Sequence, residues 1–584
     1  MRLILAVTSA LAVLAASPRA EACGGTFCDA GPMTAAVDQA AETILFVRDA
    51  GIVEAHIQIA IDPDTDAQKF AWLVPMPAVP EFAIGSQPLF DALLGASAPR
   101  YDLRGDSCGY PQTTIAFISD PDGGGASVDP DIHSETVGAF TVTTLEGGTA
   151  DAVMTWLGDN GYAQDEAAEP IIASYLADDF VLVAFRLTPQ AGIRDVHPIV
   201  LRYAGDEPCV PLRLTAIAAQ DDMGVRAFFL DEARWAPTNY RHVVLNPLQV
   251  RWGGGGYDYA AAITLAVDEA PQGHGFVTEY AGTTSMVPTG GIYSDTWASL
   301  PFSAAAPTSV VDLLNAQGLA MCPKGGPCIV PHPLVVALLR EYLPAPADVS
   351  ENQFYECLSC YADQTDFAEW DGPAFAADLE TRVIEPGRHG ALLLESWPYV
   401  TRLFTTISPH EMTLDPTFEV APDLPDVPLS QPAIATCVDC EGDAIGELPD
   451  GREVYLEGAS WPSFARTMPF AERIEQIPAQ GAPIVELDNR ADIDAALAAY
   501  NAKFECMPGG TGSGSGSGQV DGSGTASDPT GGGMPLDTGT GGSESEAGQD
   551  GGTGGQGCAC TNAPAPGFSP LLALLVLLRR RARG

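Results

Sequence analysis

Basic residues are scarce in this chain of 584 residues, which has 28 lysines and arginines against 76 aspartates and glutamates and a formal net charge of −48. A surface this acidic repels phosphate backbones and anionic lipid headgroups. Nucleic acid is therefore excluded as a partner. Cations are better candidates, although an acidic surface can also serve solubility alone.

Linear motifs of catalysis are missing as well. The eight histidines are scattered singly, without the H-E-x-x-H pattern of metalloproteases. The glycine run at 253–256 lacks the following Lys-Ser or Lys-Thr of a phosphate-binding loop. The G-x-S-x-G string at 105–109 is followed by Tyr110 and Pro111, where a nucleophile elbow needs a helix. We expect no catalytic residue, metal ligand or cofactor, and we expect His56 to be an ordinary histidine of a half-buried strand.

The N-terminus has the pattern of an export signal. Met1 and Arg2 precede an apolar stretch at 3–16, and Ala20 and Ala22 are the small residues that a signal peptidase reads. The sequence therefore predicts a signal peptide at residues 1–22 and an exported chain that begins at Cys23.

The C-terminal segment 558–584 combines two cysteines, an apolar stretch and an arginine cluster. Its apolar run at 568–578 is about 11 residues long, shorter than the roughly 17 to 25 of a free-standing transmembrane helix. Basic residues beside an apolar segment favour the cytoplasmic side. We therefore predict a membrane anchor whose sorting residues are Cys558, Cys560, Arg579, Arg580 and Arg581.

This tail resembles the Myxo-CTERM surface-sorting signal of myxobacterial proteins. The resemblance implies a sorting protease that cuts near the cysteines and a lipid that then holds the protein at the cell envelope or outer surface. Residues 507–557 are rich in glycine and serine, which predicts a disordered spacer between body and anchor.

The body between residues 23 and 506 has the pattern of an α+β protein. We predict a mainly antiparallel β-rich domain with inserted helices at 23–305, and a second domain at 306–506 with a helical subdomain and a small α/β closing segment. Expected strands lie at 43–48, 52–61, 70–76, 138–145, 180–187, 198–203, 210–216, 226–230, 453–456, 473–476 and 484–487. Expected helices lie at 150–160, 169–177, 310–316, 334–343, 352–361, 374–383 and 493–504.

The first three expected strands follow one another closely. We predict that they pair consecutively in antiparallel fashion. Residues 49–51 are predicted to form a three-residue hairpin loop with Gly51 in the left-handed conformation.

Thirteen cysteines in an exported chain favour disulfides. The candidates, close in sequence, are Cys23 with Cys28, Cys322 with Cys328, Cys357 with Cys360, and Cys437 with Cys440. Cys108, Cys209 and Cys506 are left over, so either one thiol is free or a local pairing is wrong. The two C-x-x-C motifs are also compatible with a shared zinc ion or with redox work, although their wide separation argues against one zinc site.

Several stretches of the body resemble an uncharacterised bacterial family, domain of unknown function 2330. They are CGGTFC at 23–28, FAWLVPMPAVPEF at 70–82, WLGDNGY at 156–162 and, most specifically, PYVTRLFTTISPHEMTLDPTFEVAPDLPDV at 398–427. The family brings no activity and no site residue, so the resemblance implies only a shared architecture and an envelope location.

Two classes of function remain. The first is a non-catalytic binding, adhesion or scaffold module on a flexible stalk, with an envelope or extracellular ligand. The alternative is an exported hydrolase whose site is not visible as a linear motif. The acidic surface, spacer and anchor favour the first.

Overall fold

The structure is a computed structural model. It describes residues 26–28, 39–61, 70–105, 133–160, 162, 167–188, 196–252, 256, 258–323, 328–365, 367, 370–438, 443–464 and 468–504. The predicted signal peptide, spacer and C-terminal segment lie outside these residues. Within them, no helix is both long and apolar enough to cross a membrane.

The chain has an α+β fold, as predicted, built around a ten-stranded sheet. In spatial order the strands are β21 (Ile484–Asp488), β20 (Ala471–Gln476), β13 (Arg241–Leu245), β14 (Gly275–Thr283), β15 (Tyr399–Ile407), β11 (Ala219–Asp231), β2 (Gln39–Asp49), β3 (Ile52–Ile61), β10 (Ile199–Ala204) and β5 (Glu81–Ile84). Neighbours are antiparallel except for the pairs β11–β2 and β13–β14. The ten-stranded sheet therefore contains strands from both predicted domains, 23–305 and 306–506.

A five-stranded sheet packs against one face of the ten-stranded sheet. Its strands are β1 (Thr26–Cys28), β4 (Phe70–Met76), β9 (Val181–Leu187), β8 (Phe140–Leu145) and β7 (His133–Val137). The largest apolar core lies between the sheets and includes Ile57, Val74 and Phe185. Alternation along the strands directs these side chains inward, since successive residues of a strand point to opposite faces.

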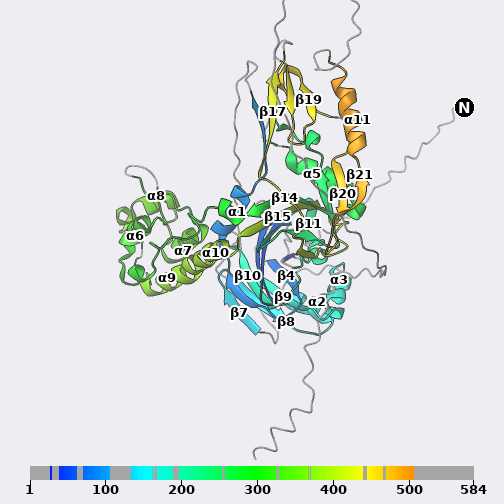
Figure 1. Ribbon diagram of the computed structural model, residues 1–584. Coiled ribbons are helices and arrows are strands. Elements are labelled where there is room, and N and C mark those ends of the chain that lie inside the picture. Colours follow the sequence, from blue (N-terminus) through cyan, green and yellow to red (C-terminus); the bar gives the residue numbers. More distant parts are fainter. Residues whose placement is uncertain are drawn as a thin grey trace, which may run out of the picture.

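Helices cover the outer faces of the two sheets. Leu73 and Leu182 of the five-stranded sheet pack against α2 (Ala150–Asp159) and α3 (Ala168–Ala177). Leu45 of the ten-stranded sheet packs against α1 (Gln87–Ala96) and α10 (Glu385–Ser396). In this region the molecule has four layers, α1 and α10, the two sheets, then α2 and α3 (Figure 1).

A helical subdomain is inserted between β14 and β15, which pair directly with Thr283 opposite Tyr399. Its helices are α6 (Val310–Gln317), α7 (Pro333–Tyr342), α8 (Glu351–Glu356) and α9 (Gly372–Leu379), continued by a π-helical turn, η10 (Glu380–Ile384), and α10. Phe302, Leu338 and Phe375 belong to a separate apolar core. Figure 1 shows the insert to one side of the sheets.

A smaller unit lies near β20 and β21, at one edge of the ten-stranded sheet (Figure 1). It contains β19 (Glu453–Leu456), β18 (Ala444–Glu447), β17 (Ser430–Cys437) and β6 (Arg100–Gly105), with α11 (Arg490–Asn501) and α5 (Tyr259–Val267). Trp252 and Leu456 are buried in its core. A two-stranded ribbon, β12 (Trp235–Pro237) with β16 (Phe418–Val420), completes the sheets.

Two predictions of strand pairing are wrong. β4 pairs with β1 and β9 in the five-stranded sheet and not with β3, because the chain crosses between the sheets after residue 61. The hairpin loop has two residues, since Asp49 is directly opposite Ile52. Ala50 and Gly51 have φ of 51° and 78°, as in a type I′ turn. The left-handed conformation predicted for Gly51 is confirmed.

The strand predicted at 210–216 is also wrong. Residues 212–215 form a short helix, α4 (Leu212–Thr215), directly after Pro211. Leu212 and Leu214 are both buried, as they would be in a strand. A short buried helix and a buried strand give the same apolar pattern, so periodicity did not separate them.

Candidate functional site

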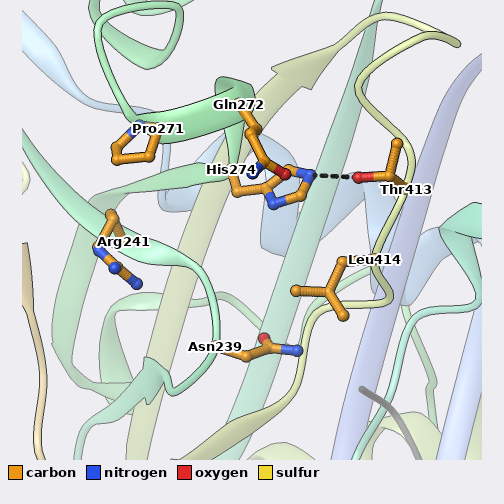
Figure 2. Close-up of a pocket in the computed structure, with 7 residues that line it drawn as sticks. All are labelled: Asn239, Arg241, Pro271, Gln272, His274, Thr413 and Leu414. Atoms are coloured by element: carbon orange, nitrogen blue, oxygen red, sulfur yellow. Dashed lines mark hydrogen bonds between the residues drawn. The ribbon is translucent and has the colours of Figure 1, made fainter. Parts of the chain in front are cut away.

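A pocket of about 390 Å³ lies where the loops before β13 and β14 meet the loop after β15 (Figure 2). It is lined by Asn239, Arg241, Pro271, Gln272, His274, Thr413 and Leu414. The side chains of Arg241, Gln272 and Asn239 surround the same opening in Figure 2. Five of the seven lining residues have polar side chains, so the pocket is suited to a hydrogen-bonding ligand.

An unusual turn forms one wall of the pocket. Gln272 has a φ of 63°, which is strained for a residue with a side chain, and Gly273 has a φ of 70°. A Cβ on Gly273 would overlap the Glu411 carboxylate, so any other residue would require that side chain to shift as well as an unfavourable backbone conformation. Strained backbone is frequent at binding sites, where the surrounding structure enforces it.

A backbone carbonyl determines which ring nitrogen of His274 carries a proton. Its Nε2 lies 2.7 Å from the backbone oxygen of Glu411 and 3.3 Å from Thr413 Oγ1. A carbonyl oxygen only accepts, so Nε2 carries the proton and donates it. The ring also stacks on Tyr240, with centroids 4.6 Å apart. His274 therefore cannot take a proton from Thr413 through this nitrogen.

The other polar groups of the pocket are held in place. Asn239 Nδ2 donates to the backbone oxygen of Asp415 at 2.7 Å, and its Oδ1 accepts from the backbone N–H of Thr417 at 2.9 Å. Arg241 Nε donates to Glu486 Oε2 at 2.7 Å. These bonds orient the amide and the guanidinium before any ligand arrives.

A second polar cluster joins the sheet to the helical insert. Glu54 and His56 lie on the face of β3 opposite the core residues Val53 and Ala55. Arg202 of β10 is directly opposite Glu54 and donates from Nε to Glu54 Oε2 at 2.7 Å. His56 Nε2 and His389 Nε2 lie 2.6 Å and 2.5 Å from Glu54 Oε1.

The environment of this cluster sets its charges. Burial lowers the pKa of His56, so its imidazole is neutral at pH 7. Burial alone would raise the pKa of Glu54, but the hydrogen bonds from His389, His56 and Arg202 outweigh it and hold that pKa well below its usual range. The carboxylate is therefore ionised.

A third cluster has the order carboxylate, imidazole, hydroxyl. His242 Nδ1 lies 3.1 Å from Glu475 Oε2, and its Nε2 lies 3.1 Å from Thr278 Oγ1. Arg234 Nη2, which can only donate, lies 3.2 Å from His242 Nε2, so Nε2 keeps its lone pair. This order resembles an activated nucleophile, but Thr278 is only 8% exposed and also accepts from Arg234 at 2.8 Å. A structural network fits these contacts better.

The fold assembles these clusters from distant elements. His56 differs from the ordinary strand histidine that we expected, since its buried Nδ1 has no hydrogen-bond partner among the residues that the structure describes. One signal was present in the sequence. Glu54, His56 and Gln58 form a polar row along a strand whose other face is apolar.

The predicted disulfide cysteines lie in three parts of the chain. Cys322 is bonded to Cys328 and Cys357 to Cys360, both within the helical insert. Cys437 at the end of β17 is disulfide-bonded. Cys28 lies in β1. Cys23, Cys440, Cys558, Cys560, Arg579, Arg580 and Arg581 lie outside the described residues.

Residues 17–293 match the model of a family described as "Uncharacterized protein conserved in bacteria (DUF2330)". The matched residues contain Glu54, His56 and Arg202, but not His389. They also exclude the segment at 398–427, on which the resemblance rested most. No curated protein matches the chain.

Two solved structures resemble the chain weakly. Baculovirus P35 is 13% identical with a TM-score of 0.21, and the match covers 34% of this chain and 65% of that one. A mutated baculovirus P35 after caspase cleavage is also 13% identical with a TM-score of 0.21, covering 33% and 66%. The chain thus spans just under two thirds of these proteins, and TM-scores this low support no conclusion about fold or function.

Proposed function

Starting from the membership of residues 17–293 in a bacterial family without a described activity, we propose that this protein is an exported, surface-tethered binding module for a small ligand. The observation that carries the proposal is the pocket at His274, whose hydrogen-bonding groups are fixed in advance. A pocket of about 390 Å³ is within the usual size range for small-molecule sites.

The chemistry of the pocket favours a small carboxylate with hydroxyl groups. Arg241 is ion-paired with Glu486 through Nε, and its planar guanidinium suits a carboxylate as a second partner. Gln272 offers both a donor and an acceptor for hydroxyl groups. The bonds that orient Asn239 and Arg241 reduce the entropy lost when a ligand binds.

Binding is a better proposal than hydrolysis for a specific reason. In the pocket, the Nε2 proton of His274 faces a carbonyl, so the imidazole does not activate Thr413. The alternative, an exported hydrolase, would use Thr278, His242 and Glu475. We favour it less because Thr278 is buried and already accepts from Arg234.

Citrate is expected to raise the melting temperature of the protein, whereas glucose, which lacks a carboxylate, should have little effect. A ligand at a hundredfold excess over Kd adds about 2.7 kcal/mol of stability, which corresponds to a rise in melting temperature of roughly 5 to 11 °C for a domain of 150 to 250 residues. Arg241→Gln should abolish the shift, and Arg104→Gln, at an exposed arginine on β6, should retain it. Differential scanning calorimetry with citrate, lactate and glucose checks this. Equal shifts in the Arg241→Gln variant, or no shift with either acid, would contradict the proposal.

The tether is the other part of the proposal, supported by the sequence of the tail. A spacer at 507–557 spans roughly 40 Å on average, enough to hold the body away from a membrane. Truncation after Gly557 is expected to release soluble protein into the medium. The double variant Cys558→Ala, Cys560→Ala should keep its uncut tail or lose surface display, as cell fractionation will show. If the double variant is processed and displayed like the parent, the cysteines are not the sorting element.

A further inference from the structure

Three groups that bind transition metals converge between β3 and α10. Glu54 Oε1, His56 Nε2 and His389 Nε2 all lie within 4.8 Å of one another. His56 is 1% exposed and Glu54 is partly buried, so two of the three are shielded by the fold. The residues come from a strand and from a helix more than 300 positions later.

The hydrogen bonds of this cluster conflict with one another. His389 Nε2 lies 2.5 Å from a carboxylate oxygen, which requires a proton on the nitrogen. The same atom lies 3.0 Å from Arg202 Nη2, which requires a lone pair there. One nitrogen cannot satisfy both partners. A cation beside Glu54 Oε1 would be bound by the single lone pair of each Nε2, so that His389 would no longer need a proton facing the carboxylate, and Arg202 Nη2 would no longer donate to His389.

Close packing fixes the backbone of α10 on both sides of His389. A Cβ on Gly387 would lie 2.4 Å from the backbone oxygen of Ile292, and a Cβ on Gly390 would lie 3.2 Å from Leu89 of α1. Glycines on both sides of His389 thus let α10 pack closely against Ile292 and α1. The helix is also preceded by the π-helical turn η10, a feature often found at functional sites.

We propose that Glu54, His56 and His389 form a binding site for a divalent transition-metal ion, with zinc as the best candidate. Two imidazoles and one carboxylate are typical zinc ligands, and three protein ligands leave a fourth position for water or an external ligand. Arg202 bonds to the other carboxylate oxygen and would orient Glu54 from outside the coordination sphere.

Metal binding requires a small outward movement. Bonds of 2.0 to 2.1 Å in a tetrahedral site place ligand atoms about 3.3 Å apart. The nitrogen-to-oxygen distances of 2.5 and 2.6 Å are shorter. His389 is the ligand that can move, because its side chain is 31% exposed and belongs to the insert. The site does not rest on the proposed pocket, which uses other residues.

Zinc binding to the full-length protein tests the proposal. The protein is incubated with excess zinc, desalted and analysed for metal, and cobalt is added separately for its visible absorption spectrum. We expect about one zinc per chain for the parent, the intense cobalt bands of a four-coordinate site, and a melting temperature that rises with zinc. His389→Ala should lose all three, and the matched control His410→Ala, at an exposed histidine, should keep them.

Two outcomes would overturn the proposal. One is a parent protein that retains less than a tenth of an equivalent of zinc. The other is a His389→Ala variant, folded by circular dichroism, that binds zinc like the parent. If His389→Ala does not fold, Glu54→Gln provides the second variant, because glutamine keeps the shape of the side chain and removes the anionic ligand. Retained zinc in that variant would equally contradict the site.

Discussion

Replacement of Asp415 with alanine is expected to lower the free energy of unfolding by about 3 to 5 kcal/mol. The Asp415 side chain is fully buried and accepts hydrogen bonds from Tyr175 and Arg213. The single Tyr175 hydroxyl proton is shared between the two carboxylate oxygens, at 2.9 and 2.8 Å from Oη, and Arg213 donates from its backbone N–H at 2.9 Å and from Nε at 2.8 Å. Alanine would remove the carboxylate that the Arg213 guanidinium and the buried Tyr175 hydroxyl bind. Removing one partner of a buried ion pair is strongly destabilising, because the remaining charge and donor are left uncompensated.

Urea unfolding followed by tryptophan fluorescence measures this loss. Asp415→Asn should lose less stability than alanine, since the amide still accepts from Tyr175 or Arg213. Asp423→Ala is the matched control, because Asp423 is exposed in the segment that follows β16, and its effect should stay within about 0.5 kcal/mol. A loss below about 1 kcal/mol for Asp415→Ala would show that this network does not stabilise the fold.

Glu42→Gln is expected to stabilise the protein by about 3 kcal/mol at pH 8 and to change little at pH 4. Glu42 lies on β2 and is 3% exposed. Burial raises its pKa from 4.5 to about 7, and the hydrogen bond from Gln39 Nε2, at 3.3 Å, lowers it only in part. The native state therefore keeps a proton that the unfolded chain releases.

The sign of the pH dependence follows from this proton. Between about pH 4.5 and 7 the native state binds more protons at Glu42 than the unfolded state does, so the parent loses stability as the pH rises. Above pH 7 both states are ionised and the cost is constant. Glutamine has no such cost. Urea unfolding of parent and variant at pH 4 and pH 8 measures the difference, with the exposed Glu419→Gln as control. Equal differences at the two pH values would contradict the buried charge.

Many strands and helices were predictable because their periodicity is local, although the central strands β14 and β15 were not among those predicted. The predicted strand at 52–61 coincides with β3, and the predicted strand at 453–456 with β19. The partner of each strand was not predictable in the same way. β4 has the pattern of a strand in either sheet, and its pairing with β9 is decided by packing across the sandwich.

The candidate sites were not predicted because each is assembled from separate segments. His274 and Thr413 meet across the loops after two different elements, and His56 meets His389 only through the insert. A strand pattern places His56 on the face opposite the core but says nothing about what covers that face. The role of Gly387 and Gly390 in close packing can be recognised only once the neighbours of α10 are known.

The insertion between β14 and β15 also has a consequence for how the chain folds. Thr283 and Tyr399 are paired, so the central sheet cannot close until the two ends of a long excursion meet. The entropy of closing a loop grows only with the logarithm of its length, but long-range pairing slows folding. Because the helical insert has its own apolar core, it can fold first and bring its two ends together. β14 and β15 then pair as the two strands of a local hairpin. The helical subdomain would then nucleate the pairing of the two central strands as well as carry His389.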